Sequence, residues 1–134
     1  RETEEKAEIR AGAETVLLVD DEEPILEVGT DMLRSLGYRV LTSRSGEDAL
    51  ALYGERGREV DLVILDMIMP GMGGAKTYEG LKRMDPRVKV LLSSGYSLSG
   101  QAEGILEQGC NGFIQKPFTV HDLSLKIREI LERG

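Results

Sequence analysis

Carboxylates and one ammonium group stand at the ends of the apolar runs of this chain. Asp20 and Asp21 close the first run, Asp66 closes a later one, and Lys116 follows a third. Because the carboxyl ends of parallel strands meet at one edge of a sheet, we expect these side chains to lie close together. Three carboxylates gathered there would repel one another unless a cation joined them. A divalent cation and the Lys116 ammonium would supply that charge.

Oxygen ligands at such an edge suit a hard cation of the magnesium type. Asp66 is the most informative acid, because it directly follows four large aliphatic residues, and exposure to solvent does not readily explain a charged residue there. Asp20-Asp21 alone would be better explained as a helix cap, and Lys116 alone as a surface lysine before a turn proline. No Gly-Lys-Ser or Gly-Lys-Thr occurs, and the glycines of residues 71–74 lack the spacing of a dinucleotide loop, so nucleotide binding is disfavoured.

The elements that must position these groups alternate along the chain. Short apolar runs predict strands at residues 16–19, 38–42, 62–65, 88–93 and 112–115. Amphipathic stretches between and after them predict five helices, two of which begin after the caps Ser45 and Thr119, each with an acid three residues on. Five strands alternating with five helices predict an α/β fold, a three-layer sandwich whose parallel sheet has helices on both faces.

Composition excludes several functional classes. A chain of 134 residues with 40% apolar content predicts one domain with an aliphatic core. The formal net charge of −7 makes direct nucleic acid binding improbable. No apolar run approaches the length of a membrane span, so we expect no membrane contact by this segment. Residues 1–14 are polar and acidic and are predicted to form a linker or tail outside the domain, and the absence of an initiator methionine suggests a segment of a longer protein.

Together, the motifs at successive strand ends resemble the receiver domain of two-component response regulators, over about residues 15–133. The motifs that carry the resemblance are Val19-Asp20-Asp21-Glu22, Leu65-Asp66-Met67-Ile68-Met69-Pro70-Gly71, Ser93-Ser94-Gly95-Tyr96 and Phe113-Ile114-Gln115-Lys116-Pro117-Phe118. The resemblance implies a doubly wound, flavodoxin-like sheet of five parallel strands in the order 2-1-3-4-5. In that order the first and third strands are neighbours, so Asp20 and Asp66 would be neighbours too.

The resemblance also implies the chemistry of the site. Asp66 would be the phosphoacceptor that takes a phosphoryl group from a phosphohistidine. Asp20, Asp21 and Asp66, with the backbone carbonyl of Ile68, would hold Mg²⁺ or Mn²⁺. Lys116 would pair with Asp66 and then with a phosphoryl oxygen.

The resemblance implies roles for three further residues. Ser94 would hydrogen-bond a phosphoryl oxygen, and Phe113 would be the switch aromatic that follows it. Lys116-Pro117 would be a cis peptide. The face made by the fourth helix, fifth strand and fifth helix would then change and select partners. Tyr96 offers no carboxylate or amide to orient an attacking water, so we expect a phosphorylated form that outlives the fastest in the family.

The expected partners are a histidine kinase dimerisation domain or a histidine phosphotransfer domain. Within the family, the residues of the motifs favour the receiver of a hybrid sensor histidine kinase. The alternative is a stand-alone receiver or the N-terminal part of a response regulator. The segment would lie in the cytoplasm, although its parent protein could be membrane-anchored.

Two functions of other classes compete with this interpretation. An aspartyl-phosphate phosphatase would carry a second Asp two residues after the nucleophile, where this chain has Ile68. The chain by itself would therefore phosphorylate itself and dephosphorylate slowly without turning over a substrate. A flavin-binding flavodoxin would carry a hydroxyl- and glycine-rich loop after the first strand, where this chain has Asp20-Asp21.

Overall fold

The computed structural model of the chain describes residues 9–95 and 100–133 and contains a five-stranded, all-parallel sheet in the order β2-β1-β3-β4-β5. The strands are β1 (Thr15–Val19), β2 (Arg39–Ser43), β3 (Leu62–Asp66), β4 (Val90–Ser94) and β5 (Gly112–Gln115). The helices are α1 (Glu23–Ser35), α2 (Gly46–Arg56), α3 (Gly74–Met84), α4 (Gly100–Glu107) and α5 (Val120–Glu132). The fold class and strand order expected from the sequence are confirmed.

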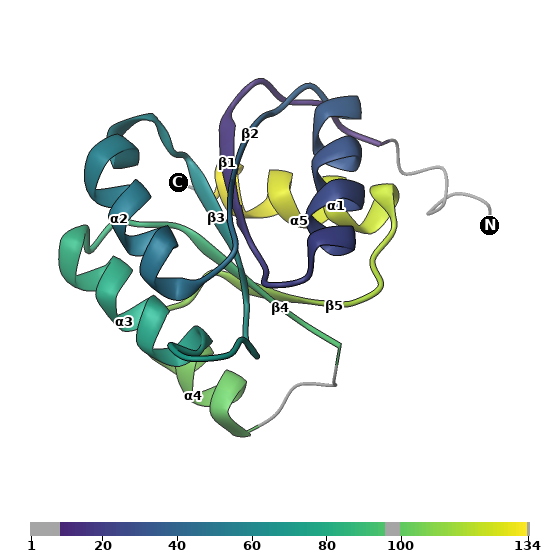
Figure 1. Cartoon of the computed structure of the whole chain (residues 1–134). Helices are drawn as coiled ribbons and strands as arrows, with labels where there is room; N and C mark the ends of the chain where they lie inside the picture. Colours follow the sequence, from purple (N-terminus) through teal and green to yellow (C-terminus); the bar gives the residue numbers. More distant parts are fainter. Residues whose placement is uncertain (1–8, 96–99, 134) are drawn as a thin grey trace.

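Helices cover both faces of this sheet (Figure 1). α2, α3 and α4 lie on one face, and α1 and α5 lie on the other. Successive strand residues point to opposite faces, so that Leu17 and Val19 enter the core under α2 and α3 while Val16 and Leu18 enter the core under α1 and α5. Because both faces are buried, the central strands read as continuous apolar runs without alternation.

Two of the helices begin at the residues predicted to cap them. The Ser45 hydroxyl accepts a hydrogen bond of 3.0 Å from the Asp48 backbone N–H, and the Thr119 hydroxyl accepts one of 3.0 Å from the Asp122 N–H. Each cap satisfies a backbone donor that the first turn of a helix leaves free. α1 has no side-chain cap among its described contacts, and Pro24 occupies its first turn.

Two strands begin later than the sequence predicts. β2 starts at Arg39 because the N–H of Tyr38 donates to the Leu33 carbonyl and so closes the end of α1. β4 starts at Val90 because the N–H of Val88 donates to the Asp85 carbonyl in the turn after α3. A 3₁₀ turn at Gly57–Glu59, which the sequence pattern does not reveal, leads from α2 toward β3.

Within the described residues, none of the helices is long and apolar enough to span a bilayer. The division of the chain into a lead-in of residues 1–14 and a domain of residues 15–133 stays a prediction. Residues 10–14 do make contacts with the domain, which are described below.

Candidate functional site

The site lies where four strands end at the same edge of the sheet. Asp20 directly follows β1, Asp66 is the last residue of the neighbouring β3, Ser94 ends β4, and Lys116 directly follows β5. The main chain joins two of these ends, because the N–H of Lys116 donates to the Ser94 carbonyl at 2.7 Å. Parallel pairing therefore brings together residues that lie up to 96 positions apart in the chain.

Three carboxylates converge at this edge. Asp20, Asp21 and Asp66 each present an oxygen, and these oxygens all lie within 4.8 Å of one another. Asp20 and Asp66 are 1% and 3% exposed, whereas Asp21 is half-buried and reaches solvent. Two sheltered oxygens and one accessible oxygen match the donors that a magnesium ion takes while it keeps several waters. The residues present therefore fit a hard divalent cation.

Lys116 is the cation already built into the site. Its ammonium lies 2.9 Å from an Asp20 oxygen and 3.2 Å from an Asp66 oxygen, and its side chain is 14% exposed. Burial alone would lower the pKa of Lys116, but the hydrogen bond to Asp20 and the charge of Asp66 raise it above its ordinary value. Lys116 therefore stays charged and holds the two acids together.

The environment of Asp66 penalises its negative charge. Burial, with repulsion from Asp20, raises the pKa of Asp66 to about 6, although Lys116 and a backbone hydrogen bond from Ile68 partly offset the rise. An acid in this condition gains from any further positive charge that joins it. A metal ion or a proton would supply that charge.

Asp20 is held in place by the main chain on both sides. Its N–H donates to the Ser43 carbonyl at 3.1 Å, and its carboxylate accepts the N–H of Glu22 at 3.0 Å. The same carboxylate is thus fixed at the turn into α1 and still contacts Lys116 through its other oxygen. The sequence motif predicts the acid but not this double anchor.

The remaining predicted residues lie around the cluster. Ser94 is 5% exposed at the end of β4, Phe113 is half-buried and packs against the core under α4, and the Ile68 side chain is 58% exposed. The Lys116–Pro117 peptide bond is cis. Tyr96 lies outside the described residues.

Gly74 permits the close packing of the loop that follows Asp66. Its N–H donates to the Met67 carbonyl at 3.0 Å, and a Cβ at this position would lie 2.7 Å from the Met67 Cα and 2.8 Å from the Asp66 carbonyl oxygen. Gly71 in the same loop has a φ of 73°, which favours glycine.

Known proteins are similar to this chain in sequence and fold. Residues 16–128 match the response regulator receiver domain. The chain belongs to this family. A solved receiver domain protein from Clostridium thermocellum superposes with a TM-score of 0.85 at 30% identity, covering 90% of this chain and 95% of that chain.

Longer proteins also contain a segment similar to this receiver domain. Sensor kinase CckA of Brucella abortus is 37% identical over 129 residues, which cover 96% of this chain and 14% of that protein. Transcriptional regulatory protein CpxR of Klebsiella pneumoniae is 34% identical over 119 residues, which cover 89% of this chain and 50% of that protein. The chain is thus a receiver domain of two-component signalling that spans at most about half of these two relatives.

Proposed function

We propose that this receiver domain accepts a phosphoryl group on Asp66 from a phosphohistidine and switches its α4-β5-α5 face in response. The observation that carries the proposal is the Lys116 ammonium placed between the buried Asp20 and Asp66, with Asp21 beside them. Three carboxylates alone would suit a cation site of any purpose. Adding Lys116 and the nearby Ser94 makes the edge suited to a phosphoryl group, whose oxygens need several positive or hydrogen-bonding partners.

In the proposed reaction, a carboxylate oxygen of Asp66 attacks the phosphorus of the phosphohistidine. The new O–P bond forms as the P–N bond breaks, and the electron pair of the P–N bond stays on the released imidazole nitrogen. The ring leaves neutral, either because its other nitrogen already carries a proton or because the released nitrogen takes one from solvent. The products are an aspartyl phosphate and a neutral histidine. No covalent help from other residues is required, because phosphoryl transfer depends on positioning and charge neutralisation.

Each neighbour of Asp66 has a role in that step. Asp20, Asp21 and Asp66, with the Ile68 carbonyl, would hold Mg²⁺ or Mn²⁺, and such an ion would supply positive charge to the phosphoryl oxygens. Lys116 is already within 3.2 Å of Asp66 and needs only a small movement to bind a phosphoryl oxygen. Ser94 would donate its hydroxyl to another oxygen, and Phe113 would reorient as the loop after β4 is drawn toward the site.

The proposed partner is a histidine kinase dimerisation domain or a histidine phosphotransfer domain. An apolar cavity of about 120 Å³ beside Lys116 supports this, since its lining comes from one face of α1 and the loop before α5. Val28 on that face is 53% exposed, so the cavity lies beside an accessible apolar side chain. A helical partner packed there would bring its phosphohistidine to Asp66.

The protein that contains this domain is proposed to be a hybrid sensor histidine kinase, acting in the cytoplasm. The similarity to a sensor kinase over nearly the whole chain supports this assignment, and the similarity to a transcriptional regulatory protein supports the alternative of a response regulator. The full reading frame decides between them. Under either assignment, Ile68 two residues after Asp66 argues against turnover of an external substrate.

Transfer from a phosphohistidine protein tests the proposal. A histidine phosphotransfer domain carrying labelled phosphate is mixed with the chain in Mg²⁺, and label on each protein is followed over time. We expect label to move to this chain and EDTA to stop the transfer. The proposal is contradicted if the label stays on the donor whichever phosphotransfer domain or kinase of the source organism serves as the donor.

A further inference from the structure

Residues Arg10–Glu14, called the strap below, are tied to the turn between α1 and β2. The N–H of Gly12 donates to the Leu36 carbonyl at 2.9 Å, and the N–H of Arg39 donates to the Glu14 carbonyl at 3.0 Å. Both bonds are formed by the main chain, so they fix the path of the strap. The strap lies before β1, at the opposite end of that strand from the acidic site.

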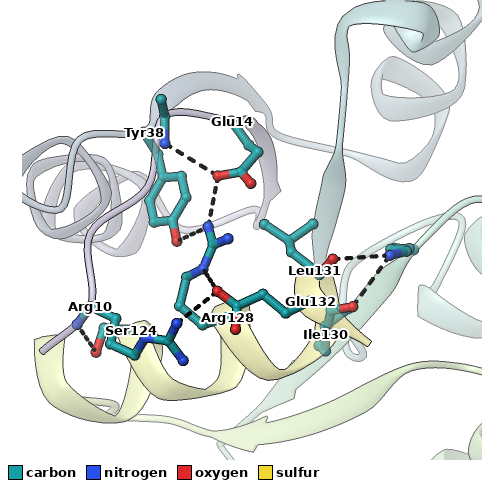
Figure 2. A network of polar contacts seen from close by, with 10 residues as sticks. Arg10, Glu14, Tyr38, Ser124, Arg128, Ile130, Leu131 and Glu132 are labelled. Carbon is teal, nitrogen blue, oxygen red and sulfur yellow. Dashed lines mark hydrogen bonds and ion pairs between the residues drawn. The ribbon is translucent and has the colours of Figure 1, made fainter. Parts of the chain in front are cut away.

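The strap is also bonded to α5 through Arg128 (Figure 2). The guanidinium donates to the Glu14 carboxylate at 2.8 Å, to the Tyr38 hydroxyl at 3.3 Å and to the Glu132 carboxylate at 3.0 Å. The Arg128 side chain is only 13% exposed. Its hydrogen bond holds the pKa of Glu14 below the ordinary value.

A second set of contacts extends the strap along the same helix. The N–H of Arg10 donates to the Ser124 hydroxyl at 3.4 Å, and its guanidinium lies 2.8 Å from the Glu132 carboxylate. Gly12 is needed for this fit, because a Cβ there would overlap the Tyr38 ring and lie 2.6 Å from the Arg128 guanidinium. One side of α5, at Ser124, Arg128 and Glu132, is therefore contacted by a specific segment of the chain.

The first turn of α5 is connected to the site at the other end of the sheet. Lys116, which contacts Asp20 and Asp66, stands three residues before the cap Thr119. The helix is thus attached at two points, through the short segment from Lys116 and through Arg128. A movement of the helix that accommodates a change at Lys116 therefore alters the contacts of Arg128, and the reverse also holds.

We propose that the strap is an intramolecular partner of α5 whose docking opposes phosphorylation of Asp66. This inference rests on the proposed function. The Lys116 ammonium contacts the Asp66 carboxylate at 3.2 Å while the strap is docked. A phosphoryl group on Asp66 moves the negative charge outward, Lys116 follows it, and the segment to Thr119 displaces the start of α5. Displacement of α5 stretches the bond between Arg128 and Glu14.

Docking of the strap and occupation of Asp66 are then linked, and the linkage is reciprocal. Releasing the strap strengthens binding at Asp66, and occupation of Asp66 loosens the strap. Each direction gives a separate measurement.

The first measurement compares variants in their affinity for beryllium trifluoride, an analogue of the phosphoryl group, in Mg²⁺ by calorimetry. Glu14→Ala and Gly12→Ala release the strap. Glu129→Ala is the matched control, because Glu129 pairs with Arg133 on the same helix without a described contact to the strap. We expect both strap variants to bind about five-fold more tightly or better, and the control to match the wild type.

The second measurement uses the wild type alone, so it stands even where a variant fails to fold. Hydrogen exchange at the Gly12 and Arg39 amides, both bonded in the docked strap, is expected to accelerate when beryllium trifluoride saturates the site. The strap proposal alone is overturned if the variants and the wild type bind beryllium trifluoride equally and amide exchange is unchanged. It is also overturned if the strap variants bind beryllium trifluoride more weakly than the wild type. A wild type that does not bind beryllium trifluoride overturns both this inference and the proposed function.

Discussion

Asp66 combines deep burial with a neighbouring carboxylate, and its ionisation therefore costs the folded chain free energy. Its folded pKa of about 6 lies above the ordinary value of 3.8, so the folded chain holds the proton more tightly than the unfolded chain does. By linkage, the stability contributed by this group is present at low pH and is lost as the pH rises from about 4 through about 6.

A pH series on Asp66→Asn checks this sign in the absence of metal. In EDTA we expect the variant to be more stable than the wild type by about 1–3 kcal/mol at pH 7.5, the difference to be clearly smaller at pH 5, and to approach zero only at about pH 4 and below. Denaturant unfolding measures both proteins. A difference that is the same at both pH values would show that Asp66 is not a strained carboxylate.

Lys116 is the residue on which the phosphoryl assignment depends most. Lys116→Ala leaves Asp20 and Asp66 buried without their cation, and we expect a loss of about 3–5 kcal/mol in stability without metal that Mg²⁺ partly restores. Metal binding should survive, while the rate of phosphorylation by acetyl phosphate falls about 100-fold.

The control is Lys82→Ala, since the Lys82 ammonium contacts the Pro86 carbonyl and not the site. Phosphorylation rates are read by intact mass at matched Mg²⁺ saturation. If the phosphorylation rate of Lys116→Ala lies within about two-fold of the control rate, Lys116 has no role in the reaction.

The acids and the lysine could be predicted as a group because each is a charged residue at the end of an apolar run. Their individual contacts could not. Lys116 lies closer to Asp20 than to Asp66, and Asp21 remains half-buried while Asp20 is enclosed. These differences depend on where the turn after β1 directs each side chain, and neighbouring aspartates in a sequence carry no information about that.

At the scale of elements, sequence patterns located the helix starts better than the strand starts. Ser45 and Thr119 are recognisable because a capping hydroxyl followed by an acid has a direct physical reason. The start of β2 depends on a hydrogen bond from Tyr38 back to α1, and β-branched or aromatic composition cannot report such a bond. The expected strand was therefore one residue too long at that end.

The exposed face of α1 gives a prediction about partner binding. Val28→Glu places a charge on the apolar surface beside Lys116, so phosphoryl transfer from a histidine phosphotransfer domain should fall at least about ten-fold. Phosphorylation by acetyl phosphate, which needs no protein surface, should be unchanged.

Met84→Glu serves as the matched control, because Met84 is 49% exposed at the far end of α3. It should leave both reactions intact. Equal losses in the two variants, or a loss with acetyl phosphate as well, would mean that α1 does not form the docking surface.

At the scale of the whole molecule, alternating strands and helices predicted the three layers, because a parallel strand buried on both faces has a distinctive composition. The docking of the strap on α5 was not predictable in the same way. Arg10–Glu14 contains no large apolar residue and so resembles a solvated tail, and its partner Arg128 lies 114 positions from Glu14. Only the folded arrangement brings the two together, and composition alone carries no sign of it.

For the whole molecule, the central inference is that this edge of the sheet takes a phosphoryl group on Asp66. Incubation with acetyl phosphate and Mg²⁺, followed by intact mass and peptide mapping, tests it most directly. We predict one added phosphoryl group on the peptide that contains Asp66, none in EDTA, and none on that peptide in Asp66→Asn. Equal phosphorylation of Asp66→Asn, or a wild type that takes up no phosphoryl group in Mg²⁺, would contradict the account.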